Sequence, residues 1–291
     1  MVMDHTRKVD KFRAYSLTGS PWFELPAAYG VACILFFRLQ LEKNQNFLSG
    51  WKSYVIIILM LMGIALSGRT GFIGFSMGLV LYILFSWRNL AGIFRNIWKI
   101  AGVFLLLLAV FYVVLTPKQR ESFVNNLFPF AFEFFYSYSE TGKFNTGSTD
   151  ALIEGHYYRL QTETLLTGEG GTSDDIPTYR HTDAGYMNNL IFGGIFYLLF
   201  LVVCQGLYVV PPMLLAGRYS SRQKQIDFYC FLFLCAYMFI LEYKAPTLGT
   251  QHITEVLLLY AGITYIVESD ALEEETGNEI YIENKPFNQG Y

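Results

Sequence analysis

The sequence predicts an all-α protein: a polytopic transmembrane helix bundle of about seven spans, with a large periplasmic loop that contains helices. Two observations favour this class. Of the 291 residues, 53% are hydrophobic and only 15% are charged, whereas about 25% of an average soluble domain is charged. The chain is also rich in Phe (26 residues) and Tyr (21 residues). Aromatic residues are enriched in membrane proteins at the interface between the bilayer and water.

The apolar residues gather in segments of the length that a membrane requires. A spanning helix needs about 20 mainly apolar residues, with a range of about 17–25, and shorter spans are accommodated by local thinning of the bilayer. Because unpaired backbone groups are costly in lipid, these segments must be helical. The candidate spans cover about residues 26–41, 53–67, 71–87, 97–115, 184–210, 226–243 and 253–268. The expected order is therefore four transmembrane helices (26–115), a loop (116–183) and three transmembrane helices (184–268).

Basic residues alternate between the two sides of the predicted bundle. The loops on one side hold Arg38, Lys43 and Lys52; Arg88, Arg95 and Lys99; and Arg218, Arg222 and Lys224. The short loops on the other side hold one basic residue each, Arg69 and Lys244. Because Lys and Arg mark cytoplasmic loops, this pattern places the long loop 116–183 outside, together with all four histidines.

The two ends of the chain are polar. Residues 1–25 would lie in the periplasm, yet no signal peptide precedes them. We therefore expect the chain to be the C-terminal part of a longer protein whose earlier helices are missing, or to have a misplaced start. Residues 269–291 are acidic and have little apolar pattern, which predicts a solvated cytoplasmic tail.

Composition also argues against several classes of partner. The net charge is −3 and no basic face stands out, which argues against nucleic acid. The four cysteines lie inside apolar segments and form no CxxC pair, so they are expected to be buried apolar residues. The histidines lack the spacing of a metal site, so we predict neither a metal nor another cofactor.

The long loop carries a predicted helix over residues 148–168, "STDALIEGHYYRLQTETLLTG". At about 100° per residue, His156, Arg159 and Glu163 share one face of that helix. Two interpretations are open. The face is either solvated and held by an Arg159–Glu163 pair at spacing i, i+4, or it presents an arginine and a histidine to an anionic substrate.

A second group of polar residues stands just before the fifth span, in "RHTDAGY". Asp183 is either the N-cap of the following helix or a partner that orients His181 for proton transfer. The N–H groups at the start of that helix also favour an anion. A turn after the sixth span carries Lys244 and His252, and there Lys244 either supports this outer face or extends to the interface.

Taken together, these pieces resemble the O-antigen ligase and polymerase family of bacterial integral-membrane glycosyltransferases. The similar segments, in the family's usual order over about residues 13–210, are "RAYSLTGSPWFELPAAYG", "SGRTGFIGF", "YYRLQTETLLTGEGG" and "HTDAGYMNNLIFGGIF". The resemblance implies an enzyme of the bacterial cytoplasmic (inner) membrane with its active site facing the periplasm. Such enzymes transfer a glycan from undecaprenyl pyrophosphate to another lipid-linked repeat unit (polymerase) or to lipid A–core (ligase), without metal or nucleotide.

The resemblance also implies roles for individual residues. Arg69 and Arg159 would bind the pyrophosphate, and Arg13 matches the family's arginine ahead of the first span. His181 would be the base for the acceptor hydroxyl or a phosphate ligand, and Asp183 its orienting partner or the base itself. Residues expected to support this face are His156, Glu163, Lys244 and His252.

Two other functions compete with this one. The first is a non-enzymatic transporter of lipid-linked glycans or solutes. Transporters more often place charges within spans and carry internal repeats, and this sequence shows neither pattern. The second is a peptidoglycan-type polymerase of the rod-shape and division family, whose characteristic motifs are not evident here. Between polymerase and ligase, "HTDAGY" slightly favours the polymerase.

Overall fold

The computed structural model describes residues 24–42, 51–68, 70–122, 124–125, 137–139, 142, 150, 152–217 and 222–248. Its elements are α2 (Glu24–Glu42), α3 (Trp51–Ser67), α4 (Thr70–Ser86), the 3₁₀ helix η1 (Trp87–Asn89), α5 (Leu90–Val114), α6 (Pro117–Ser122), the π-helical turn η3 (Leu152–His156), α10 (Thr162–Thr167), α11 (Gly185–Gly217) and α12 (Arg222–Glu242). No strand occurs in this part of the chain. The predicted all-α class is therefore confirmed for these residues.

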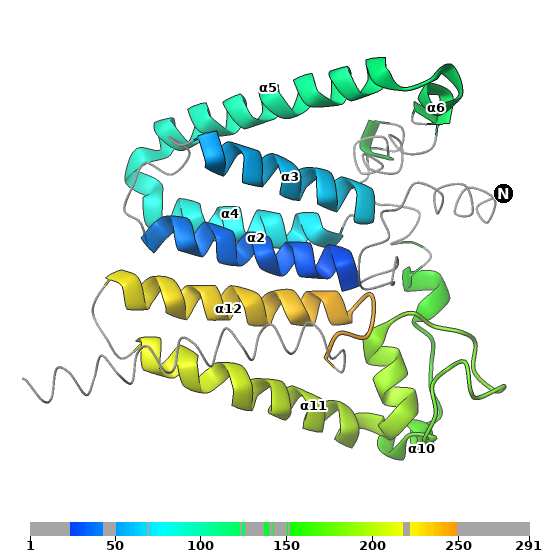
Figure 1. Cartoon of the computed structure of the whole chain (residues 1–291). Coiled ribbons are helices and arrows are strands. Elements are labelled where there is room, and N and C mark those ends of the chain that lie inside the picture. Colours follow the sequence, from blue (N-terminus) through cyan, green and yellow to red (C-terminus); the bar gives the residue numbers. More distant parts are fainter. Residues whose placement is uncertain are drawn as a thin grey trace, which may run out of the picture.

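Several helices are long and apolar enough to cross a membrane. Within the described residues these are the stretches Thr70–Val114, Gly185–Leu207 and Lys224–Glu242, and shorter apolar helices run over Leu25–Leu41 and Trp51–Ala65. The first stretch comprises α4, η1 and α5, and the chain reverses its direction at η1 (Figure 1). These lengths indicate a membrane protein.

The predicted ends of the chain lie largely outside the described residues. This holds for the seventh span (253–268), for the acidic tail (269–291) and for all but the last two residues of the N-terminal segment 1–25. The first six predicted spans each coincide with a helix of the structure, α2 to α5, α11 and α12.

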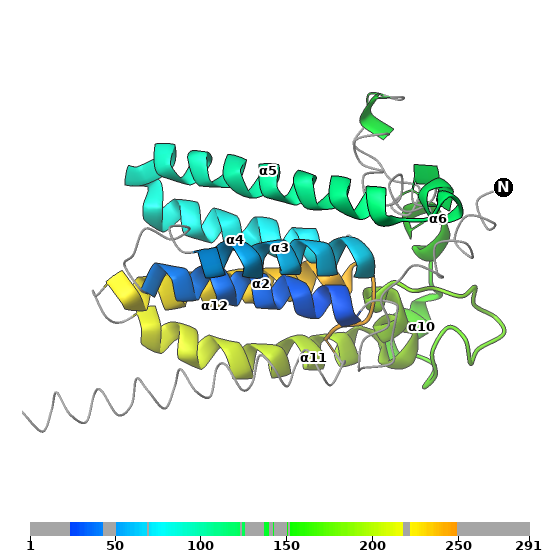
Figure 2. The ribbon, with the colours of Figure 1, turned by 45° about the horizontal axis from the view of Figure 1, so that its top comes forward.

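Helix α2 lies at the centre of the bundle and packs against α3, α4 and α12 (Figures 1 and 2). Helix α11 packs on α12, and α5 contacts α3 and α4 from the opposite side. The core contains Phe37, whose ring meets that of Phe75 edge-on with 5.5 Å between centroids. Tyr237 of α12 is fully buried, and its hydroxyl donates to the carbonyl of Thr70 at 3.2 Å. This bond joins α12 to the start of α4.

Small residues explain the close contact between α2 and α4. Gly71, Gly74 and Gly78 are buried in α4 and recur at helical spacing. A Cβ atom on Gly74 would come within 2.3 Å of the Cα atom of Gly30 in α2. Such stripes of small residues let backbones approach in membrane helix pairs, where van der Waals contact drives association.

The outer face of α5 is apolar and uncovered. Leu105 and Leu106 are each 63% exposed, and Val114 is 77% exposed. An apolar face of this extent is unusual on a soluble monomer but expected where a helix meets lipid.

The start of the fourth predicted span differs from the structure. The sequence predicts a loop after the third span that holds Arg88, Arg95 and Lys99. In the structure only the short helix η1 separates α4 from α5, because α5 already begins at Leu90. Residue 97, the predicted start of the fourth span, is where the apolar segment begins, and it is not where the helix begins. Arg and Lys are good helix formers, so the helix itself extends seven residues further toward the N-terminus.

The bundle has two distinct ends. The loop end comprises Gly68, residues 152–184 and residues 243–248, and the basic end comprises η1 and the start of α12 at Arg222 (Figures 1 and 2). As far as the structure describes them, the segments that charge alternation assigned to one side of the membrane thus lie at one end of the bundle.

Candidate functional site

The segment that precedes α11 is extended, and its side chains alternate between two environments. Thr182 and Ala184 are buried, whereas His181 and Asp183 are exposed. In an extended chain, residues i and i+2 point to the same side. His181 and Asp183 therefore meet, with 3.1 Å between the imidazole Nε2 and the carboxylate Oδ1.

Thr182 fixes this segment in place. Its hydroxyl donates to the carbonyl of His156 at 2.9 Å, and its backbone N–H donates to the hydroxyl of Ser173 at 3.1 Å. The amide of Asn188, in the first turn of α11, donates to the carbonyl of Thr182 at 2.7 Å. Each such bond contributes about 0.5–1.5 kcal/mol, and together they hold three loop segments against the start of α11.

A second carboxylate approaches His181 from the other side. The imidazole Nδ1 lies 2.5 Å from Oδ1 of Asp174. Asp174 belongs to a turn in which Asp175 accepts the backbone N–H and the hydroxyl of Thr172 at 3.0 and 2.7 Å. These bonds to Thr172 lower the pKa of Asp175. Sequence reasoning missed Asp174, because turn composition marks "TSDD" as a turn but not as a neighbour of His181.

The two carboxylates determine the protonation of His181. An ionised carboxylate only accepts hydrogen bonds, so both ring nitrogens donate when the imidazole is charged. Hydrogen bonding to Asp174 is the largest cause that raises the pKa of His181 above its ordinary value of 6.5, and the charge of Asp183 adds to it. The two acids therefore favour the protonated form of His181.

His156 completes the group. Its Nδ1 accepts the backbone N–H of Asp183 at 2.8 Å, and its ring lies edge-on to that of His181 with 6.2 Å between centroids. Because a backbone N–H is always a donor, a neutral His156 must carry its proton on Nε2. We call His156, Asp174, His181 and Asp183 the His181 cluster.

Arg180, the residue before His181, has contacts of its own. The guanidinium of Arg180 lies over the ring of Tyr158, 5.6 Å from its centroid, and donates to the carbonyl of Glu154 at 3.2 Å. The hydroxyl of Tyr158 in turn donates to the carbonyl of Arg180 at 2.7 Å. Arg180 was not among the predicted phosphate-binding residues, although its place next to His181 in the sequence was a signal for it.

The prediction of one continuous helix over residues 148–168 is wrong. Among the described residues of this range, η3 ends at His156, residues 157–161 form no helix, and α10 begins at Thr162. Tertiary contacts override the helical pattern here, because the hydroxyl of Tyr157 donates to the carbonyl of Tyr243 at 2.7 Å while Tyr158 is bound to Arg180.

The consequence concerns Arg159 and Glu163. They do not form the predicted helical pair, and both are exposed. Within the described residues, no hydrogen bond or ion pair joins either side chain to the His181 cluster.

Helix α11 is broken at the point where the loop after α10 binds to it. Gly193 and Gly194 have non-helical backbone angles, and Gly194 lies at φ 66°, ψ −167°. The backbone N–H groups of Glu169 and Gly170 donate to the carbonyls of Ile191 and Phe192 at 2.7 and 2.9 Å. At the break, two carbonyls of the helix have no partner within the helix, and the N–H groups of the loop bind to them.

A buried carboxylate joins α11 to α12. Glu242, the last residue of α12, has no exposed surface and accepts the side-chain amide of Asn189 in α11 at 2.6 Å. It also accepts the backbone N–H groups of Thr247 and Leu248 at 2.5 and 2.7 Å. Lys244 lies half-buried in the turn that these bonds shape.

Three predicted site residues, Arg13, Arg69 and His252, lie outside the described residues. Both neighbours of Arg69, Gly68 and Thr70, are buried at the loop end. No group of three or more His, Cys, Asp or Glu side chains in the described part of the chain is placed to hold a metal ion.

Comparisons with known proteins give no relative. No protein-family model matches the chain, and no curated protein and no solved structure is significantly similar to it.

The raised pKa of His181 makes the loop end sensitive to pH. A raised pKa in the folded protein means that the contribution of His181 to stability is complete below the unfolded pKa, near 6.5, and is lost as the pH rises through the folded pKa. We expect His181→Gln to lower the thermal unfolding temperature more at pH 6 than at pH 9. An unfolding temperature deficit that stays constant between these pH values would contradict a charged His181.

Proposed function

We propose that the protein is a metal-independent membrane glycosyltransferase of the O-antigen polymerase and ligase type. It polymerises or ligates surface-polysaccharide repeat units carried on undecaprenyl pyrophosphate. The observation that carries this proposal is the His181 cluster: an imidazole between two carboxylates and in ring contact with His156, at one end of a bundle of apolar helices.

The position of the cluster supports a lipid-linked substrate. Asp183 stands two residues before Gly185, where a stretch long enough to cross a membrane begins. A donor whose pyrophosphate lies at the headgroup level and whose polyprenyl tail lies in lipid requires a site at this depth. We place the loop end in the periplasm and the basic end in the cytoplasm of a bacterial inner membrane, with about seven spans, because basic residues mark the cytoplasmic side.

The chemistry assigns the base to a carboxylate. An acceptor hydroxyl attacks the anomeric carbon of the donor sugar, the bond from that carbon to the pyrophosphate oxygen breaks, and the hydroxyl proton goes to the base. His181 is a poor base, since a carboxylate oxygen already lies within hydrogen-bond distance of each of its ring nitrogens. Asp183 is the base, and His181 holds its carboxylate in place while His156 fixes its backbone.

The cations serve the leaving group. Negative charge develops on the departing pyrophosphate, and arginine suits it because its planar fork binds phosphate oxygens and stays charged. The guanidinium of Arg180 is oriented by the ring of Tyr158 and the carbonyl of Glu154. Arg69, Arg159 and Arg13 supply further positive charge in this proposal.

One observation favours the alternative, a transporter of lipid-linked glycans or solutes. Transporters often bind substrate at broken helices, and α11 is broken at Gly193 and Gly194. In this chain, however, the carbonyls of Ile191 and Phe192 before the break accept the loop N–H groups. The break therefore serves to anchor the loop, and the enzyme is the better supported function.

The test is transfer by the complete purified protein. We expect it to extend undecaprenyl-pyrophosphate-linked repeat units, or to transfer them to lipid A–core, in the presence of a metal chelator. Arg180→Ala should lower kcat/KM at least about tenfold, which corresponds to about 1.4 kcal/mol, and Arg180→Lys should restore part of it. Arg95→Ala removes the same charge from the far end of the bundle and is the control. Movement of the glycan lipid across vesicles without transfer would establish the transporter instead.

A further inference from the structure

The carboxylate of Glu242 is a buried group that the proposed transfer reaction does not use. Its Oε1 atom accepts the side-chain amide of Asn189 in α11 at 2.6 Å. Its Oε2 atom accepts the backbone N–H groups of Thr247 and Leu248 at 2.5 and 2.7 Å, and the hydroxyl of Thr247 at 2.9 Å. A buried carboxylate is costly without such donors. One side chain therefore joins the beginning of α11 to the turn that follows α12, residues 243–248.

The contact with α11 lies close to Asp183. Gly185, two residues after Asp183, is buried against the same carboxylate, and a Cβ atom at this glycine would come within 2.3 Å of Oε1 of Glu242. Gly185 and Asn189 are four residues apart and therefore lie on one face of the helix. Because that face rests on Glu242, the carboxylate sets the position of the chain directly after Asp183.

The contact with the turn also leads to Asp183. In the turn, the carbonyl of Tyr243 accepts the hydroxyl of Tyr157 at 2.7 Å, and the two rings stack with 4.8 Å between their centroids. Tyr157 directly follows His156, whose Nδ1 accepts the backbone N–H of Asp183 at 2.8 Å. Glu242 thus lies where two series of contacts that hold Asp183 meet.

We propose that Glu242 is a positioning residue for glycan transfer, whose carboxylate holds Asp183 in place through the start of α11 and through Tyr157. This inference rests on the proposed function, in which Asp183 is the base. Glu242 has no exposed surface, so it acts on the reaction through its neighbours and not by contact with a substrate. A displacement of about 1 Å can lower a rate about 10²-fold. The effect of losing Glu242 is therefore expected in kcat and not in KM.

The experiment reverses the hydrogen bond between positions 189 and 242 in the full chain. Asn189→Asp alone places two carboxylates against each other, and at about pH 8 their repulsion opens the contact. In the double variant with Glu242→Gln, the amide N–H at position 242 donates to the carboxylate at position 189, and the amide oxygen still accepts the N–H groups of the turn. The bond returns with donor and acceptor exchanged.

Two measurements follow the variants. We expect Asn189→Asp to lower kcat about tenfold with KM changed less than about twofold, and the double variant to recover kcat to within about threefold of the wild type. Amide hydrogen exchange of the peptide that contains Asp183 should accelerate in Asn189→Asp and slow again in the double variant, and this measurement needs no transfer activity. If Asn189→Asp does not fold, Glu242→Asp takes its place, because the shorter side chain cannot reach both partners, and the same fall in kcat is expected.

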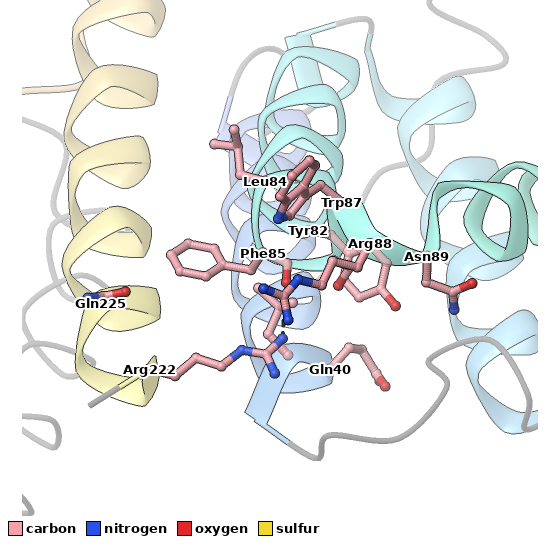
Figure 3. Close-up of a pocket in the computed structure, with 11 residues that line it drawn as sticks. Gln40, Tyr82, Leu84, Phe85, Trp87, Arg88, Asn89, Arg222 and Gln225 are labelled. Carbon is pink, nitrogen blue, oxygen red and sulfur yellow. Dashed lines mark hydrogen bonds between the residues drawn. The ribbon is translucent and has the colours of Figure 1, made fainter. Parts of the chain in front are cut away.

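Two control variants separate this role from general effects. Gln225→Glu makes the same change from amide to acid near the other end of α12, where Gln225 is exposed and lines a pocket (Figure 3). Tyr186→Phe removes a different bond between α11 and α12, from the tyrosine hydroxyl to the carbonyl of Phe239 at 3.0 Å. Both variants should keep kcat within about twofold of the wild type.

The outcomes distinguish the positioning role from the proposed function. A double variant no more active than Asn189→Asp would overturn the positioning role, and so would an equal fall of kcat in Tyr186→Phe. Wild-type transfer together with unchanged exchange at Asp183 in Asn189→Asp would overturn the positioning role alone. A wild-type protein that transfers no glycan would refute the proposed function, and with it the role of Glu242 in transfer.

Discussion

Replacement of Asp183 by Asn is expected to lower the rate of glycan transfer by about 10²–10⁴-fold, the range for loss of a general base. The amide keeps the shape of the carboxylate but does not take up the acceptor's proton. The backbone N–H of residue 183, which binds His156, is unchanged. The fall should therefore appear in kcat with little change in KM, and the thermal unfolding temperature should stay close to that of the wild type.

A neighbouring acid separates this role from a general effect of charge. Asp174→Asn removes the other carboxylate of the cluster but leaves Asp183 beside His181. We expect a smaller loss, about tenfold, because a positioning contact is removed while the base remains. Glu154→Gln removes an exposed carboxylate of the same loop whose only described contact is through its carbonyl, and it should behave like the wild type.

Comparison of the two Asn variants decides which carboxylate is the base. Wild-type turnover in Asp183→Asn would remove this residue from the mechanism. A tenfold larger loss in Asp174→Asn than in Asp183→Asn would assign the base to Asp174.

The sequence predicted the part of this site that is local. His181 and Asp183 are two residues apart in an extended segment, so their proximity follows from backbone geometry. The approach of Asp174 and His156 depends on the bonds of Thr182 to Ser173 and His156. Those contacts join segments that no local pattern relates, and they could not be predicted from spacing.

The same division holds for the fold. The helices of the bundle were predicted because an apolar segment of about 20 residues has few alternatives in lipid. The failures occur where tertiary contacts compete with a local pattern. Residues 157–161 leave the helix because their tyrosines have distant partners, and α11 breaks where the loop binds to it.

The second large effect is expected from this break. Gly194 has φ 66° and ψ −167°, a backbone conformation that is essentially restricted to glycine and costs other residues about 1–3 kcal/mol. A Cβ atom there would also come within 2.3 Å of the carbonyl oxygen of Leu166. Gly194→Ala must therefore displace α10 or straighten α11, and either change breaks the bonds of Glu169 and Gly170 to the helix.

We expect Gly194→Ala to lower the free energy of unfolding by about 2–4 kcal/mol, the sum of the strain and the lost hydrogen bonds. Amide hydrogen exchange at residues 169 and 170 should accelerate, and transfer activity should fall because the turn with Asp174 follows directly in the chain. Gly206→Ala is the matched control in the same helix, since no described residue lies within 4 Å of a Cβ atom at that position. Ala is the better helix former there by about 1 kcal/mol, so Gly206→Ala should leave stability unchanged or raise it. If the two variants unfold at the same temperature, the loop is not anchored at the break, and the helix with its glycines serves only to cross the membrane.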